Sequence, residues 1–137
     1  MIIFDQTIPS DMSGVTEFVS AVFEKLSFLS FDEPTVFNLK LCLHEAVVNA
    51  IKHGNKLNSK LRVRVIIKNE ENKLIFEVDD QGEGFDPQSI PDPTAEENIL
   101  KCSGRGVFLI KNIMDDVQFQ NNGKTIKMVK LLKKEEG

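Results

Sequence analysis

A carboxylate and a carboxamide stand one helical turn apart in the run Glu45-Ala-Val-Val-Asn49. In a helix, residues four positions apart lie on the same face, so Glu45 and Asn49 would be neighbours. Such a pair polarises a water or hydroxyl and helps to hold a hard cation such as Mg²⁺, which prefers oxygen ligands. The alternative is an ordinary solvated helix face, and the helix taken alone favours that alternative.

A second group of candidate residues lies in the run Asp79-Asp80-Gln81-Gly82-Glu83-Gly84. Two glycines let the backbone turn tightly and approach a ligand closely, and the carboxylate before them accepts hydrogen bonds from an amino group. A calcium loop is a competing interpretation, but the spaced ligand series of an EF-hand is missing. A plain turn is the third.

A third group, Ser103-Gly104-Arg105-Gly106, directly precedes a segment with helical apolar spacing. Glycines at a helix start expose unpaired N–H groups at the positive end of the helix dipole, which favours phosphate. The Walker lysine is absent, and no strand precedes these glycines as a dinucleotide-binding loop requires. On its own, such a glycine pair indicates only a turn.

The rest of the chain predicts the elements that position these residues. Apolar residues recur at three- and four-residue steps in three segments and predict helices over residues 15–29, 33–54 and 106–117, the second capped by Asp32. Strand-like patterns occupy residues 2–8, 62–69, 73–80, 117–120 and 125–132, the last two separated by the turn Asn121-Asn122-Gly123. Residues 80–106 read as a long irregular loop, which is uncommon unless functional.

This order of elements predicts a two-layer α/β (α+β) sandwich, with helices on one face of a mostly antiparallel sheet. On the wheel of the second helix, one face carries leucines, valines and alanines and the opposite face carries Asn38, Glu45, Asn49, Lys52 and His53. A chain of 137 residues fits one domain, residues 1–137.

Composition excludes several classes of function. The net charge of −4 argues against binding nucleic acid, which needs a basic surface. No leader-like start and no long uncharged apolar run is present, so we expect a cytoplasmic protein that does not bind a membrane. Cys42 and Cys102 lie far apart, outside any CxxC pattern, and are expected to be buried free thiols.

Together the three groups resemble the sequence boxes of the GHKL (Bergerat-fold) ATPases. Residues 45–54 resemble the N box, residues 80–84 the G1 box and residues 104–110 the G2 box, in the same order and at similar spacing. The runs HEAVVNAIKHGN and GRGVFLIKNIMDDV look most like the anti-sigma factor serine kinases.

The resemblance implies a Bergerat ATP-binding fold, ATP and Mg²⁺ as cofactors, and a role for each site residue. Glu45 would be the general base, Asn49 the Mg²⁺ ligand and Asp80 the partner of the adenine amino group. Gly82 and Gly84 would let the nucleotide approach, and Thr125 would lie near the adenine. The residues expected around the phosphates are Gly104, Arg105 and Gly106, together with Lys52 and His53.

The resemblance also implies partners: a sigma factor, a small antagonist protein that the kinase phosphorylates, and a second copy of the chain in a homodimer. One departure concerns Cys102, because some members have an arginine there that suits the terminal phosphate. Lys101 or Arg105 would have to take the place of that arginine in this chain. Phosphoryl transfer depends on neutralising developing charge. The alternative function is therefore a nucleotide-sensing module that binds a partner without transferring phosphate.

Overall fold

The structure, a computed structural model, describes residues 1–82 and 105–132 of the chain. Along the sequence, the strands are β1 (Ile2–Pro9), β2 (Arg62–Glu70), β3 (Lys73–Asp79), β4 (Asp116–Gln120) and β5 (Thr125–Leu131). The helices are α1 (Val15–Lys25), α2 (Glu33–Asn49) and α4 (Arg105–Ile113), with a short 3-10 turn at Met12–Gly14 and a π-helical turn at Ala50–Gly54.

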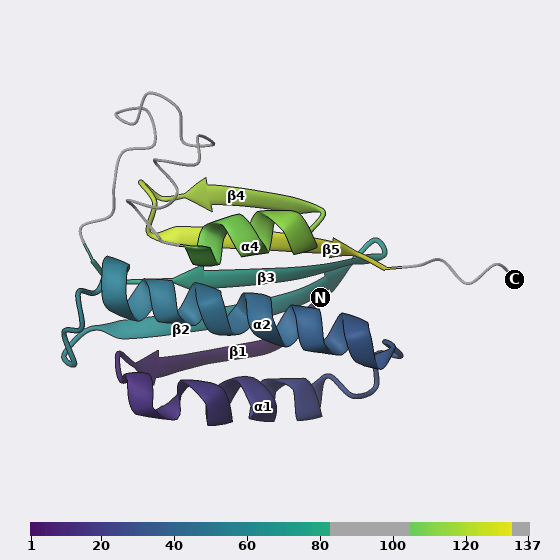
Figure 1. Ribbon diagram of the computed structural model, residues 1–137, viewed down its shortest axis with the longest axis horizontal. Helices are drawn as coiled ribbons and strands as arrows, with labels where there is room; N and C mark the ends of the chain where they lie inside the picture. The colour runs from purple at the N-terminus through teal and green to yellow at the C-terminus, as the bar shows by residue number, and fades with distance from the viewer. Residues whose placement is uncertain (83–104, 133–137) are drawn as a thin grey trace, which may run out of the picture.

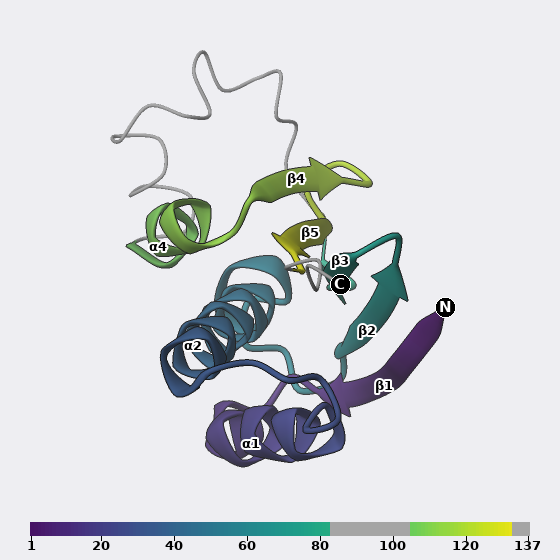
Figure 2. The same ribbon diagram turned by 90° about the vertical axis from the view of Figure 1, so that its right-hand side faces the viewer.

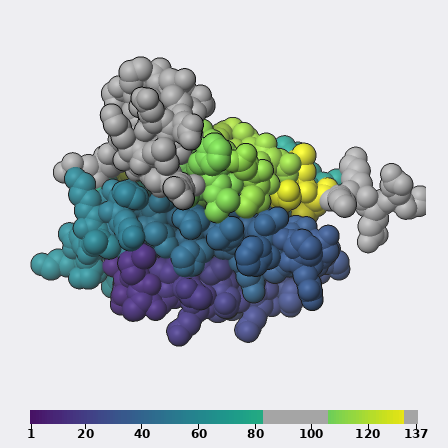
Figure 3. All heavy atoms as spheres, in the orientation of Figure 1, coloured from purple at the N-terminus to yellow at the C-terminus, as the bar shows by residue number. Residues whose placement is uncertain are grey.

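The strands form one sheet in the order β1-β2-β3-β5-β4, and every neighbouring pair is antiparallel. The three helices lie together on one face of this sheet (Figures 1 and 2). Seen from outside the helical layer, α2 lies between α1 and α4 (Figure 3). The predicted two-layer α/β architecture is confirmed.

Short-range signals explain where several elements begin and turn. The Asp32 carboxylate accepts a hydrogen bond from the Thr35 N–H at 2.9 Å and caps α2, as predicted. Glu71 and Asn72 join β2 to β3 with φ values of 47° and 63°. Two positive φ values in a two-residue loop match the right-handed twist of a hairpin.

Two helices are shorter than their apolar spacing predicts. The first ends at Lys25 rather than residue 29, although Leu26 beyond its end is still buried against the core. The third ends at Ile113, because Val117 pairs with Met128 across β4 and β5. Apolar residues continue to face the core past each helix end, so their spacing overestimates the length of the helix.

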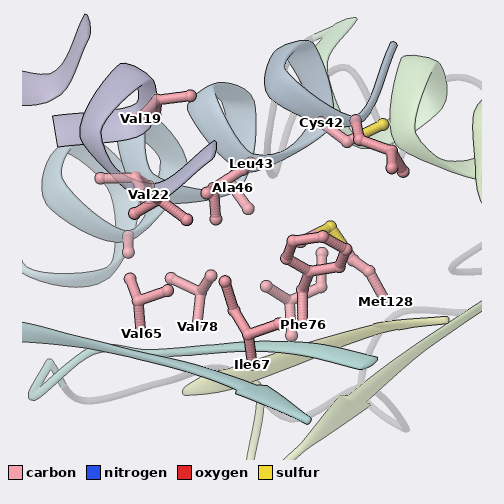
Figure 4. Close-up of a cluster of buried hydrophobic side chains, with 14 of the residues drawn as sticks. Val19, Val22, Cys42, Leu43, Ala46, Val65, Ile67, Phe76, Val78 and Met128 are labelled. Carbon is pink, nitrogen blue, oxygen red and sulfur yellow. The ribbon is translucent and has the colours of Figure 1, made fainter. Parts of the chain in front are cut away.

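The core lies between the helical layer and the sheet (Figure 4). Phe76 of β3 is fully buried, and its ring stacks on Phe23 of α1 with 6.1 Å between the ring centroids. Cys42 is a buried free cysteine, as predicted, and burial raises the pKa of its thiol to about 12. Cys102 lies outside the described residues. Nowhere in residues 1–82 and 105–132 is a helix long and apolar enough to cross a membrane.

Candidate functional site

The candidate residues from distant parts of the sequence meet at one end of the molecule. The end of α2 with its π-helical turn, the end of β3, and the starts of α4 and β5 all lie there (Figure 1). The antiparallel order of β3 and β5 brings Asp79 opposite Thr125. The topology therefore gathers the described parts of the three sequence boxes at a single place.

Glu45 and Asn49 lie beneath the first turn of α4. A Cβ atom built on Gly106 would lie 2.7 Å from Glu45 Oε2 and 3.1 Å from Asn49 Nδ2. Only a glycine allows the α4 backbone to come this close to both side chains. Both side chains are half-buried, so the solvated helix face that α2 alone favours is not what the structure shows.

Asn49 has a buried polar atom that lacks a hydrogen bond. Within the described part of the chain, its Nδ2 is the buried side-chain nitrogen or oxygen for which no partner is found. Most buried polar groups in folded proteins are paired, so an unpaired one calls for a ligand or another explanation. Its position beside the Glu45 carboxylate fits a polar ligand held between α2 and α4.

Asp80 lies half-buried just past the end of β3. Its main-chain N–H donates to the Lys124 carbonyl at 2.9 Å, and its Oδ1 accepts from the Gly82 N–H at 2.9 Å. Burial raises the pKa of the Asp80 carboxyl, and the Gly82 hydrogen bond and the charge of Lys124 oppose that rise. A partly desolvated carboxylate of this kind is suited to accept hydrogen bonds from a ligand.

Gly54 and Gly82 let the backbone of the π-helical turn touch the segment after β3. A Cβ on Gly82 would overlap the Gly54 carbonyl oxygen, and a Cβ on Gly54 would overlap the Asp80 carboxylate. Neither glycine leaves room for a side chain. The Asp80 carboxylate is thus pressed directly against the end of the helix that carries Glu45 and Asn49.

The π-helical turn itself ends with a hydrogen bond from the Asn55 N–H to the Ala50 carbonyl at 2.7 Å. Lys52 and His53 project from this turn and are exposed. Extra residues inserted into a helix in this way often occur at functional sites. Helical spacing in the sequence carries no sign of the wider turn.

Thr125 is buried at the start of β5, where its hydroxyl donates to Asp79 Oδ1 at 2.6 Å. Asn121 Nδ2 donates to the same hydroxyl at 2.8 Å. Because paired residues share a face of the sheet, Thr125 lies with Asp79, whereas the Asp80 carboxylate contacts Gly54 of the helical layer. Gly84 and Gly104 lie outside the described residues, as does the side chain of Arg105, the first residue of α4.

Three further residues border the site and were not singled out from the sequence: Asn55, Gln81 and Lys124. Asn55 is buried and its Oδ1 accepts from the Gln81 N–H at 2.8 Å. Nothing local marks them, because an Asn after a helix-ending glycine and a Gln in a turn are ordinary turn residues. Only the long-range hydrogen bonds reveal their position.

The donor set at this site fits Mg²⁺ held together with phosphate oxygens. In the segments that the structure describes, no group of three or more His, Cys, Asp or Glu side chains could hold a metal ion alone. Mg²⁺ is commonly held by one or two protein oxygens plus substrate phosphates and waters. Asn49, with Glu45 beside it, offers that kind of partial ligand set.

Comparisons with known proteins agree with this geometry. The sequence model of the histidine kinase-like ATPase domain matches residues 8–130. The serine-protein kinase RsbW of Staphylococcus epidermidis is 33% identical over 126 residues, covering 86% of this chain and 77% of that protein. RsbW of Staphylococcus aureus strain JH9 is 32% identical with the same coverage.

Proposed function

Because this chain belongs to the histidine kinase-like ATPase family, we propose that it is an ATP-dependent serine-protein kinase whose active site lies between α2, the end of β3 and the start of α4. The observation that carries the proposal is the unpaired Asn49 amide beside the Glu45 carboxylate, both beneath Gly106. An ATPase domain binds ATP. Within the described chain, the unpaired buried side-chain amide lies at this position, where a bound ligand could form a hydrogen bond with it.

In this proposal Asp80 accepts a hydrogen bond from the adenine amino group. Its raised pKa and its half-buried position against Gly54, at the end of the helix that carries Glu45 and Asn49, support that assignment. The proposed role of Thr125 near the base is indirect, because its hydroxyl bonds Asp79, the residue before Asp80, on the other face of the strand. Gly84 is proposed to let the nucleotide approach closely. The phosphates extend toward α4, where the proposed neighbours are Gly104, Arg105, Gly106, Lys52 and His53.

The first turn of α4 supports phosphate at its N-terminal end, because unpaired N–H groups and the helix dipole favour negative charge there. Asn49 would hold Mg²⁺ through its side-chain oxygen. When bound, the ion neutralises charge on the phosphates.

The proposed reaction transfers the terminal phosphoryl group of ATP to a serine hydroxyl of a partner protein. The serine oxygen forms a bond to the γ-phosphorus as the bond between that phosphorus and the bridging oxygen breaks. ADP leaves with the electron pair, and Glu45 takes the serine proton. The place of Glu45 on α2, beside Asn49 and under Gly106, supports this role.

We assign the partners from the family resemblance and from the relatives, which are named serine-protein kinases. The substrate is a small antagonist protein that presents a serine, and the controlled target is a sigma factor. A second copy of the chain in a homodimer completes the proposed assembly. The proposal includes no direct contact with nucleic acid or with a membrane. The proposed location is the cytoplasm.

Glu45→Gln tests the proposal, since it keeps the size of the side chain and removes the base. We expect ATP affinity to stay within about twofold, while transfer of labelled phosphate to the antagonist falls about 10²-fold or more. Glu33→Gln is the matched control, because Glu33 is an exposed carboxylate at the other end of the same helix. It should transfer phosphate at the wild-type rate.

Two other outcomes would contradict the proposal. If the wild-type protein fails to bind Mg-ATP in a calorimetric titration, the proposed nucleotide site does not exist. Wild-type protein that binds ATP and captures its partner in an ATP-dependent way, with no phosphotransfer and no effect of Glu45→Gln, would instead establish the nucleotide-sensing module.

A further inference from the structure

The side chain of Asn55 is buried and makes three hydrogen bonds to segments that are far apart in the sequence. It is 1% exposed. Its Nδ2 donates to Ser10 Oγ at 2.6 Å and to the Arg62 carbonyl at 3.0 Å, while its Oδ1 accepts from the Gln81 N–H at 2.8 Å. Both donor hydrogens and one acceptor site of the amide are therefore used.

These bonds join the strand ends beside the candidate site. Ser10 follows β1 and donates through its own Oγ to the Leu61 carbonyl at 3.0 Å, and Arg62 opens β2. Gln81 is held a second time, because its Oε1 accepts from the Arg62 N–H at 2.6 Å. The segment after β3 is thus fixed by a network in which Asn55 makes the central contacts.

Hydrogen bonds fix the backbone on both sides of Asp80, and the Asn55 network supplies the bond on the C-terminal side. The Gln81 N–H belongs to the peptide group that follows Asp80, so the Asn55 bond fixes the plane of that group. The peptide group before Asp80 is fixed by its N–H bond to the Lys124 carbonyl at 2.9 Å. With both planes held, the φ and ψ angles of Asp80 are set, and so is the direction of its Cα–Cβ bond. The Gly82 N–H bond to Oδ1 at 2.9 Å then orients the carboxylate itself.

We propose that Asn55 is a positioning residue for base recognition, which aims the Asp80 carboxylate so that the site prefers a nucleotide with an exocyclic amino group. This inference rests on the proposed function. A well-aimed carboxylate accepts a hydrogen bond from the amino group of adenine, whereas a carbonyl oxygen at that position of the base would face it as a second acceptor. If the carboxylate is no longer held in this direction, its hydrogen bond to the adenine amino group weakens, and a base with a carbonyl oxygen at that position is excluded less strongly.

A comparison of ATP with ITP tests the inference. ATP has an amino group at this position of the base, and ITP has a carbonyl oxygen there. Wild-type protein should bind ATP more tightly than ITP. Asn55→Ala should weaken ATP binding about tenfold and ITP binding less than about twofold, so that most of the preference disappears. Calorimetric titration of both nucleotides with Mg²⁺ measures the four dissociation constants.

Hydrogen exchange provides a readout independent of nucleotide. The Gln81 amide should be protected in the wild type and exchange faster in Asn55→Ala, with the amides of α2 unchanged. Asn58→Ala is the matched control in the same loop, where the exposed Asn58 side chain accepts only from the nearby Lys60 N–H at 3.0 Å among the bonds described. It should change neither the nucleotide preference nor Gln81 exchange.

The outcomes separate the inference from the proposed function. A wild type that binds neither nucleotide ends both. A wild type that prefers ATP, with an Asn55→Ala variant that loses thermal stability but keeps the ratio of ATP to ITP affinity, overturns the inference alone. If Asn55→Ala does not fold, Ser10→Ala is the fallback variant, because it removes one hydrogen-bond acceptor of the network. If the Gln81 amide exchanges faster in Ser10→Ala while the ratio of ATP to ITP affinity is unchanged, the inference is likewise overturned.

Discussion

Two residues of the candidate site have polar groups in environments that cost the folded protein stability. The buried Asn49 Nδ2 lacks a partner in the described chain, and burial raises the pKa of Asp80. An unpaired buried amide or a partly desolvated carboxylate is unfavourable unless a ligand compensates for it. Both groups point to binding rather than to the stability of the fold.

Asp80→Asn should therefore stabilise the ligand-free protein slightly while abolishing ATP binding. A carboxyl whose pKa is higher in the folded state contributes stability below its unfolded pKa and loses it as pH rises through the folded value. The variant should exceed the wild type at neutral pH by less than about 1 kcal/mol, since the group is partly solvated. The difference should shrink as pH falls toward about 4.

Urea unfolding of both proteins across that pH range measures the difference. Asp5→Asn is a useful comparison, because the Arg64 guanidinium holds the pKa of the exposed Asp5 carboxyl below its usual range. Its effect on stability should have the opposite sign. A stability loss at neutral pH in Asp80→Asn would show that its carboxylate is structural.

At the scale of elements, the packing of α4 on α2 decides whether Glu45 and Asn49 form a site. The first turn of α4 covers both side chains because Gly106 has no Cβ. The π-helical turn then brings Gly54 against Asp80 at the same end of α2. The proposed site thus depends on two close backbone approaches, each made at glycine.

Gly106→Ala should impair phosphotransfer in a protein that still folds. The added methyl would lie 2.7 Å from Glu45 Oε2, so α4 or the carboxylate must shift. We expect phosphotransfer to fall at least about tenfold, at a cost of about 1–3 kcal/mol in stability, as for an overpacked contact. Steady-state phosphorylation and urea unfolding measure the two effects.

Gly14→Ala is the matched control, because nothing lies within 4 Å of a Cβ built there. It should leave both activity and the free energy of unfolding near wild-type values. Normal phosphotransfer in Gly106→Ala would mean that the carboxylate can shift without cost, and that Glu45 is not held in place for the reaction.

At the scale of the whole molecule, the helices of the described chain form one layer on one side of the sheet, and this layer supports the site. Side chains from the sheet and from the helices face one another across that interface and form one core cluster (Figure 4). Phe76 is completely buried there, whereas the adjacent Ile75, also buried, lies on the opposite face of the sheet and outside the main core cluster. Substitutions at the two residues therefore compare the two faces of the same strand, β3.

Phe76→Ala should lower the free energy of unfolding by about 3–5 kcal/mol, because it removes a ring from the interior and leaves a cavity. Ile75→Ala should cost less, since its side chain packs against neighbouring strands without a helical layer above it. Urea unfolding measures both. Equal losses would place the stabilising core on both faces of the sheet.

Much of the fold follows from local physical signals in the sequence. Alternation in residues 62–69 and 73–80 and helical spacing in residues 33–54 predicted β2, β3 and α2, because each period is imposed by burying one face of the element. The Asp32 cap and the turn at Asn121-Asn122-Gly123 depend on neighbouring residues alone. Ends of helices were less predictable, because burial of Leu26 and Val117 continues beyond them.

The sequence by itself determined which residue types occur in which boxes, and hence the family and the candidate residues Glu45, Asn49 and Asp80. Tertiary structure alone decided that Gly106 covers Glu45, that Gly54 contacts Gly82, and that Asn55 holds Gln81. Those contacts join residues whose separation in the chain ranges from 26 for Asn55 and Gln81 upward. No local period or turn preference encodes contacts between residues so far apart in the chain. These contacts form only when the strands are ordered in the sheet and the helices pack on it.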